Sequence, residues 1–222
     1  MNVFDIIGPV MIGPSSSHTA GAVRLGNVAY KLMDAETPED VEITLSGSFA
    51  RTGQGHGTDR ALMGGIMGFP PDDARIRDAL QLATERGIHY RFRMEDIPGA
   101  HPNTARISYK LTDGREGTVE GASIGGGNIR IDNINGMSVD FTGERDTILV
   151  LHRDRPGVIA NVTNLMREKY PDINICSFQL SRMERGGEAL MTIETDTVPA
   201  ESLTVEIRKL PDVLNALLVH RV

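Results

Sequence analysis

Glycine is distributed very unevenly along this chain of 222 residues, and this distribution is the feature that most constrains its fold. Most of the 24 glycines precede residue 146, with clusters at Gly53–Gly57, Gly64–Gly68 and Gly125–Gly127. Glycine permits tight turns and close backbone approach at a cost in chain entropy. Compact apolar runs replace these clusters after Asp146. The polar segment Thr142–Asp146 therefore marks a boundary, and we expect one domain over residues 1–143 and a smaller one over residues 146–222.

The first domain combines helices with strands. Apolar residues recur at helical spacing over residues 17–33, and again between Asp72 and Gly87, so both segments are predicted helices. Alternating apolar and polar residues predict strands over Val41–Leu45, Ile88–Met94, Ile107–Leu111, Val119–Ile124, Ile129–Ile134 and Met137–Phe141. Because strands outnumber helices, we predict an α+β fold with an antiparallel sheet.

The second domain has a more regular pattern. Strands are predicted over Thr147–Leu151, Ile173–Leu180, Ala189–Thr195 and Val213–Val219. One helix is predicted over Pro156–Lys169, with proline in its first turn, and a second around Leu203–Leu210. The resulting order, β-α-β-β-α-β, is that of a ferredoxin-like unit.

Charge and hydropathy exclude several partners. The net charge is −7, and no block rich in Lys or Arg occurs, so we expect neither nucleic acid nor an anionic membrane as a partner. The sequence contains no run of 18 apolar residues that could span a bilayer. No Lys or Arg precedes Arg24, so the basic start of a signal peptide is absent. Cys176 is the only cysteine, which fits a reducing compartment and leads us to expect a cytoplasmic protein. It falls in the predicted strand Ile173–Leu180, where we expect it to be buried in an apolar role.

The cysteine count also limits cofactor chemistry. An iron–sulfur cluster is normally held by several cysteine thiolates, and a structural zinc site by four closely spaced Cys or His ligands. With one cysteine, we expect this chain to hold neither by itself.

The segment Gly13–Ala20 places three serines and a histidine at the start of the first predicted helix. The hydroxyl groups of Ser15, Ser16 and Ser17, together with the free N–H groups of a helix N-terminus, could bind an anion. No Gly-Lys-Ser/Thr follows, so this segment is not a nucleotide-binding P-loop. Taken alone, the pattern is equally compatible with one serine capping the helix and His18 being an ordinary residue of its first turn.

The segment Gly53–Asp59 places His56 between glycines, ahead of a helix expected to begin near Thr58. An imidazole on such a loop would be open to substrate and would titrate near neutral pH, as a general base requires. The alternative is a flexible surface loop. The segments His101–Thr104 and Ser123–Gly127 are weaker candidates for the edges of a site, because both are also common in turns.

The second domain resembles the ACT domain family. The resemblance rests on Asp154-Arg155-Pro156-Gly157 directly after the first strand and on Ile173-Asn174-Ile175 at the second. It implies that the domain pairs side by side with a second copy and binds a small ligand such as an amino acid between the two. Asp154, Pro156, Gly157 and Asn174 are then the candidate effector-binding residues. The alternative is that Asp154 and Pro156 only start a helix, as in ferredoxin-like units without ligands.

The whole chain resembles the β chain of iron–sulfur-dependent L-serine dehydratase. Five motifs carry the resemblance in this order: Val3–Pro9, Gly13–Ala20, Gly55–Asp59, His101–Thr104 and Ser123–Gly127. The first domain of that family is also similar to an allosteric substrate-binding domain found in some phosphoglycerate dehydrogenases.

This resemblance implies a lyase that converts L-serine to pyruvate and ammonia without pyridoxal phosphate. Its [4Fe–4S] cluster would be ligated by cysteines of a separate α chain, with no metal ligand in the present chain. His56 and His18 correspond to the family's active-site histidines and are the candidate catalytic residues. The candidate substrate-binding residues are Ser15, Ser16, Ser17, Thr19, Asp59, His101 and Asn103.

Two other functions remain open at this stage. The chain could be a regulatory subunit without a catalytic role, sensing serine or another small amino acid, or an amino-acid-binding dimer without an enzyme partner. The sequence also leaves open which histidine removes the α-proton, which effector or ion acts on the ACT domain, the α/β stoichiometry, and whether threonine is a substrate.

Overall fold

The computed structural model describes residues 10–221, so the motif Val3–Pro9 lies outside the described residues. The chain divides into two compact units between Asn135 and Gly136. Both combine helices with strands, which confirms the predicted α+β class. No helix within residues 10–221 has the length and apolar character needed to cross a membrane.

The first unit builds its helices and strands close to the predicted positions. Its helical elements are a π-helical turn η2 (Ser17–Gly21), α1 (Ala22–Leu32), α2 (Gly47–His56), α3 (Thr58–Ile66), a 3-10 turn η3 (Ala74–Asp78) and α4 (Ala79–Glu85). Its strands are β1 (Asp40–Leu45), β2 (His89–Met94), β3 (Thr104–Lys110), β4 (Glu116–Gly125) and β5 (Asn128–Ile134). The next strand is β6 (Met137–Phe141).

Strands β1 to β5 form one sheet in the order β2-β1-β3-β4-β5. β1 pairs antiparallel with β3, β3 with β4, and β4 with β5. β2, however, runs parallel to β1, so the prediction of a purely antiparallel sheet was wrong. The reason lies in the connection: α2, α3 and α4 intervene between β1 and β2, and a helical crossover returns the chain in the same direction.

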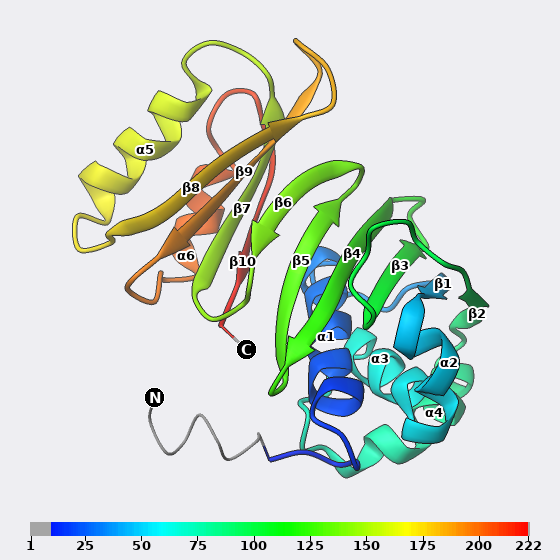
Figure 1. The fold of residues 1–222 in the computed structure, drawn as a ribbon. Coiled ribbons are helices and arrows are strands. Elements are labelled where there is room, and N and C mark those ends of the chain that lie inside the picture. Colours follow the sequence, from blue (N-terminus) through cyan, green and yellow to red (C-terminus); the bar gives the residue numbers. More distant parts are fainter. Residues whose placement is uncertain (1–9, 222) are drawn as a thin grey trace. The chain divides into compact units, whose positions relative to one another are not determined.

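Helices α1 to α4 lie on one face of this sheet (Figure 1). Val41, Ile43 and Leu45 of β1 are buried there. Helices α1 and α3 approach each other closely because both carry glycine at the contact. A Cβ on Gly65 would lie 2.0 Å from the carbonyl oxygen of Val23, and one on Gly26 would lie 2.3 Å from that of Leu62. These glycines therefore set the distance between the two helices.

The segment containing His56 departs from the prediction. We expected Gly53–Gly57 to be a loop, but the structure continues α2 through Gly53 and Gly55 to His56. Phe49 and Gly53, one helical turn apart, are buried, and this packing outweighs the low helix propensity of glycine. Gly57 then takes a left-handed conformation with φ of 71°, which lets α3 begin immediately. His56 is thus fixed at the end of a helix.

The second unit is the predicted ferredoxin-like fold. Its elements are β7 (Asp146–Arg153), α5 (Val158–Lys169), β8 (Ile175–Arg182), β9 (Glu188–Thr195), α6 (Ser202–Ile207) and β10 (Val213–Val219). The four strands form an antiparallel sheet in the order β10-β7-β9-β8. Apolar residues of β7, β9 and β10 form a core with Val158, Val162 and Met166 of α5 and with Leu203 and Ile207 of α6.

Strand β6 belongs to the second compact unit. The boundary between the units therefore lies N-terminal to the segment 142–146, where the sequence predicts it. It contacts β8 and β9, and the Asp140 backbone N–H donates to Oε1 of Gln179 at 3.1 Å. The domain ranges 1–143 and 146–222 remain a prediction.

Strand β8 is an edge strand, and its side chains are more exposed than we expected. We predicted Cys176 to be buried in this strand, but it is exposed. Phe178 and Leu180 are also about two-fifths exposed, at 40% and 39%. The prediction was wrong because β8 has a neighbouring strand on one side only.

The glycine contact between α1 and α3 gives a stability prediction. Gly65→Ala is expected to lower the free energy of unfolding by about 1–3 kcal/mol, because the new methyl group has no space beside Val23. The matched control is Gly55→Ala in α2, where a Cβ meets nothing within 4 Å. That variant should be unchanged or gain up to about 1 kcal/mol. Urea denaturation of both variants is the measurement, and an unchanged Gly65→Ala would contradict the packing.

Candidate functional site around His18 and His56

One face of α2 carries Ser48, Thr52 and His56, spaced four residues apart. Residues four apart lie on the same side of an α-helix, so these three side chains form a polar stripe. Thr52 Oγ1 donates to the carbonyl oxygen of Ser48 at 2.9 Å, which uses the only hydroxyl proton of Thr52. Its oxygen is thereby left as an acceptor.

His18 lies against this stripe from the π-helical turn that precedes α1. Its Nε2 is 3.0 Å from Thr52 Oγ1 and 3.5 Å from Ser48 Oγ. Because the Thr52 proton is already donated, the short contact assigns the imidazole proton to Nε2. The other ring nitrogen, Nδ1, then carries the lone pair and accepts from Ser15 Oγ–H at 3.4 Å. His18 is thus oriented by both segments, 9% exposed, and Nδ1 is its basic atom.

The two candidate catalytic histidines lie next to each other. Their ring centroids are 4.7 Å apart at an interplanar angle of 52°. The Phe49 ring packs against His18 in an edge-to-face arrangement, with the two ring centroids 5.2 Å apart. Burial lowers the pKa of His18 below its ordinary value, and the nearby His56 lowers it further, with a partial offset from the Ser48 backbone. His18 is therefore neutral at pH 7, while His56 is exposed to solvent.

The segment His101–Asn103 holds the start of α2 in place. The Pro102 carbonyl oxygen accepts hydrogen bonds from the backbone N–H groups of Ser48 and Phe49, at 2.5 and 3.3 Å. His101 Nδ1 accepts from the Asn103 backbone N–H at 3.2 Å, and Asn103 Nδ2 donates to the Ser123 carbonyl oxygen at 3.3 Å. His101 and Asn103 thus lie beside the histidine pair in a supporting position.

Ser123 connects β4 to the turn that carries His18. Ser123 is fully buried, and a Cβ on Gly21 would lie 2.1 Å from its Oγ. The end of the π-helical turn therefore rests directly on β4. Arg24 of α1 donates to the Gly127 carbonyl oxygen at 2.6 Å, which fixes the glycine turn after β4.

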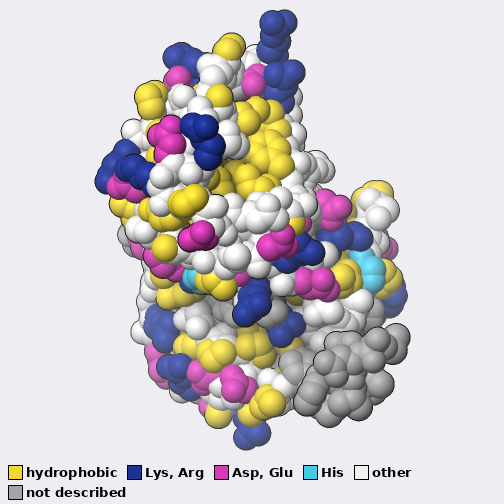
Figure 2. Space-filling view, turned by 90° about the vertical axis from the view of Figure 1, so that its left-hand side faces the viewer, with side chains coloured by type: hydrophobic (Ala, Val, Ile, Leu, Met, Phe, Trp, Pro, Cys, Tyr) yellow, Lys and Arg dark blue, Asp and Glu magenta, His cyan; other side chains and the backbone are white. Residues whose placement is uncertain are grey.

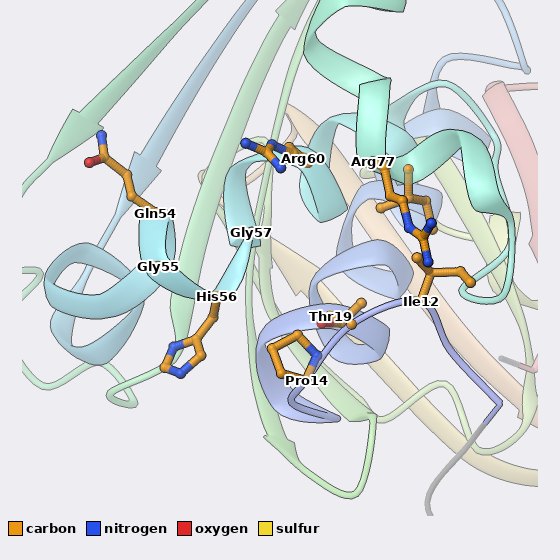
Figure 3. Close-up of a pocket in the computed structure, with 11 residues that line it drawn as sticks. Ile12, Pro14, Thr19, Gln54, Gly55, His56, Gly57, Arg60 and Arg77 are labelled. Atoms are coloured by element: carbon orange, nitrogen blue, oxygen red, sulfur yellow. The ribbon is translucent and has the colours of Figure 1, made fainter.

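A cavity of about 400 Å³ opens next to the histidine pair, between the chain segment before η2 and the beginning of α3 (Figure 3). His56 and Thr19 line it, as do two arginines, Arg60 and Arg77. Asp59 is outside these contacts: it is partly exposed, and its Oδ1 accepts from the Arg60 backbone N–H at 2.8 Å.

The structure thus brings together most of the predicted residues, but not all. Ser15 and His56 each contact His18, and Thr19, His101 and Asn103 lie on neighbouring segments. Ser16 and Ser17 are half-buried in the same turn. Sequence reasoning missed Ser48, Thr52, Arg60 and Arg77. The four-residue spacing Ser48–Thr52–His56 was a usable signal, but it was hidden by treating the glycines around His56 as a loop.

The residues do not form a metal centre. Across residues 10–221 there is no group of three or more His, Cys, Asp or Glu side chains that could hold a metal ion. Cys176 lies exposed on β8 of the second unit. The donor set for an iron–sulfur cluster is therefore not found in the described part of this chain.

The candidate effector residues of the second unit lie at opposite ends of its sheet. Asp154 follows β7, and its Oδ2 accepts from Arg182 Nη1 at 2.6 Å and from the Gly186 backbone N–H at 2.9 Å. The Gly186 and Arg182 hydrogen bonds lower the pKa of Asp154. Pro156 and Gly157 follow Asp154 directly.

Asn174 stands before β8, at the other end. Its Nδ2 donates to Asp196 Oδ2 at 2.7 Å. The register pairs Ile175 with Thr195, whereas Arg182 pairs with Ala189. Asn174 therefore lies eight residues from Arg182, which marks the Asp154 end within one chain, a span of roughly 26 Å at 3.3 Å per residue.

Comparison with known families agrees with this architecture. The model of the serine dehydratase β chain family matches residues 2–133, more than half of the chain. The chain belongs to the serine dehydratase β chain family. A model described as an AHAS small subunit-like ACT domain matches residues 148–215, within the ferredoxin-like unit.

Relatives support this membership over almost the full length. The chain is 46% identical over 213 residues to a probable L-serine dehydratase β chain of Bacillus subtilis (strain 168), covering 96% of this chain and 95% of the relative. It is 42% identical over 203 residues to the L-serine dehydratase β chain of Peptoniphilus asaccharolyticus, covering 91% and 90%.

The chain is also similar to part of a different enzyme. The chain is 30% identical over 201 residues to D-3-phosphoglycerate dehydrogenase of Bacillus subtilis (strain 168). The match covers 89% of this chain but 37% of that enzyme, so the same two-part module is attached to other sequence there.

The histidine contact gives a prediction for pH dependence. The folded-state pKa of His18 is below 6.5, the ordinary value, so the unfolded chain takes up this proton at higher pH than the folded chain. The stability contributed by the neutral His18 should therefore be present above about pH 6.5 and be lost as pH falls below it. His220 contributes in the opposite direction, because burial alone would lower its pKa but the hydrogen bonds to Asp146 and Glu201 outweigh burial and raise it. His56→Gln removes the repulsion and should raise the pKa of His18.

A proton NMR titration of the histidine rings measures this shift. His89→Gln is the matched control, because His89 lies exposed at the start of β2 and should leave the pKa of His18 unchanged. A His18 pKa that does not respond to His56→Gln would contradict the proximity of the two rings.

Proposed function

We propose that this chain is the β subunit of an L-serine dehydratase, in which His18 and His56 complete an active site formed with a separate α chain. The single observation that carries the proposal is the oriented, neutral His18 in contact with the exposed His56, in a chain of the serine dehydratase β chain family. The relatives' names, L-serine dehydratase β chain, support both the substrate and the existence of a partner subunit.

In this proposal the reaction is an elimination followed by hydrolysis. His56 accepts the α-proton of L-serine, the electrons of that C–H bond form the Cα=Cβ bond, and the β-hydroxyl group leaves. The product, 2-aminoacrylate, tautomerises to an imine, which water hydrolyses to pyruvate and ammonia. His56 suits the base role because it is exposed at the end of α2 and lines the cavity.

His18 has a different task. It is held by Thr52 and Ser15, so its ring is fixed while Nδ1 remains basic. A fixed, neutral imidazole can orient the substrate. It can also receive the proton that the neighbouring His56 has taken from the substrate. Ser15, Ser16 and Ser17 then orient the carboxylate or the leaving hydroxyl group, with Asp59, His101 and Asn103 as further candidates.

We assign the [4Fe–4S] cluster of this enzyme class to the α chain. The support is the donor set: one cysteine in the sequence, exposed on β8, and no cluster of metal-ligating side chains within residues 10–221. The proposal further includes catalysis without pyridoxal phosphate and a cytoplasmic location, in keeping with the family resemblance and the low cysteine content.

Substitution of His56 tests the catalytic role. In the enzyme reconstituted from both chains, His56→Ala should lower kcat for pyruvate formation by about 10²–10⁴-fold, the usual contribution of a general base. The control His89→Ala removes an exposed imidazole far from the site and should leave kcat within about twofold.

Substitution of both histidines distinguishes the catalytic role from its main alternative, a regulatory role. If the chain only senses serine for an α chain that performs all the chemistry, His18→Ala and His56→Ala will leave kcat intact and alter activation alone. That result would replace the catalytic proposal by the regulatory one.

We also propose that the ACT domains pair through β8. Its outer edge has no strand partner within the described chain, and Phe178 and Leu180 lie opposite the core residues Ile193 and Met191 of β9, yet stay partly exposed. Figure 2 shows hydrophobic side chains gathered on the surface of this unit. Unpaired edges with apolar side chains are typical sites for strand addition.

Antiparallel pairing of two β8 strands also explains the separated effector residues. A two-fold axis would bring Asn174 of one copy toward the Arg182 end of the other, where Asp154, Pro156 and Gly157 lie. A small amino acid could then bind between the copies, with residues from both.

A charge on this edge tests the pairing. Phe178→Asp should convert the dimer to a monomer, because it places an unpaired carboxylate in an apolar contact. Val205→Asp is the control, since Val205 is also exposed, at 51%, but lies on α6. Light scattering after size-exclusion chromatography gives the masses, and a dimer that survives Phe178→Asp would contradict pairing through β8.

A further inference from the structure

The cavity beside His56 contains two arginines that have no partner. Arg60 lies in the first turn of α3, and Arg77 in the 3-10 turn before α4 (Figure 3). Both side chains are exposed, and within residues 10–221 neither guanidinium group takes part in an ion pair or a side-chain hydrogen bond. By contrast, Arg75, two residues before Arg77, is paired with Asp73 at 2.6 Å.

The cavity also contains an unsatisfied hydroxyl group. Thr19 is 2% exposed, lines the cavity, and its Oγ1 has no hydrogen-bond partner. Gly13 runs directly beside it, since a Cβ there would lie 2.2 Å from Thr19 Oγ1. Buried hydroxyl groups are rarely left without a partner in folded proteins. Thr19 lines the same cavity as the two exposed arginines, and its buried, unsatisfied hydroxyl group beside two unpaired cations points to a ligand that carries hydrogen-bond acceptors.

We propose that Arg60, Arg77 and Thr19 bind the carboxylate group of L-serine. This inference rests on the proposed function, and it adds the residues that recognise the substrate. Guanidinium groups match the geometry of a carboxylate with two hydrogen bonds, and the threonine hydroxyl can donate a further one. The volume, about 400 Å³, accommodates a molecule of this size.

The position of His56 connects the carboxylate site to the proposed reaction. His56 and both neighbouring glycines, Gly55 and Gly57, line the same cavity. The proposal requires that a carboxylate held at the arginines place the adjacent α-carbon, and its proton, within reach of the His56 imidazole across the cavity. The arginines are therefore binding and positioning residues, and His56 remains the base.

Calorimetric titration of the full chain with L-serine tests this site without requiring turnover. L-serine should bind, whereas L-serinamide, which lacks the carboxylate, should bind at least tenfold more weakly. Arg60→Gln and Arg77→Gln should each weaken L-serine binding at least tenfold. The matched control is Arg75→Gln, which removes the same charge from the same turn but from a paired residue outside the cavity, and should change binding less than twofold.

Thr19 is tested by two substitutions of different chemistry. Thr19→Val keeps the shape and removes the hydroxyl group, so binding should weaken severalfold. Thr19→Ser keeps the hydroxyl group and should retain most of the affinity. If Thr19→Val and Thr19→Ser bind L-serine equally, the hydroxyl group has no role and that part of the assignment is wrong.

Other results would overturn the site as a whole. Equal binding of L-serine and L-serinamide would show that the carboxylate is not recognised. Unchanged binding in both arginine variants would show that the arginines do not bind L-serine. Inorganic phosphate is the competing anion: if phosphate binds and depends on Arg60 and Arg77 while L-serine does not bind, the cavity recognises a phosphate group instead.

The site and the proposed function can fail separately. If L-serine binds at the arginines but the two-chain complex forms no pyruvate, the proposed function fails and the site stands. If the complex is active and Arg60→Gln and Arg77→Gln leave KM for L-serine unchanged, the site fails and the function stands. Circular dichroism of each variant confirms that a loss of binding does not reflect unfolding.

Discussion

The contact between His18 and the polar face of α2 is the interaction on which the site depends. It joins two segments 34 residues apart through the 3.0 Å hydrogen bond to Thr52. The same contact fixes the tautomer of His18 and brings its ring against His56. Because it is built from a helix and a helical turn, both histidines are held by rigid elements, which is what a catalytic arrangement requires.

Small residues make this arrangement possible. Gly21 allows the π-helical turn to rest on Ser123, and Gly57 allows α3 to start directly after His56. The contact of Gly26 and Gly65 brings α1 and α3 together beneath them. The abundance of glycine in the first part of the chain therefore serves close packing of helices around the site more than flexibility.

Much of the fold was predictable from periodicity, because most helices and strands bury one regular face. The ferredoxin-like unit and the strands of the first unit followed from that pattern. The parallel β2 strand did not, because its direction is set by the crossover through three helices. Cys176 was misjudged because edge position is a tertiary property. His18 and His56 were found through motifs, whereas Thr52 became visible once α2 was known to be a helix. Arg60 and Arg77 became visible only from the cavity that they line.

The most direct test of the account is a structure of the complex between this chain and its α chain, with L-serine bound under conditions that prevent turnover. The account predicts the α-carbon within roughly 3–4 Å of the His56 imidazole, the spacing of a reactive geometry. L-serine bound entirely by the α chain, with His18 and His56 more than roughly three times that distance away, would contradict it.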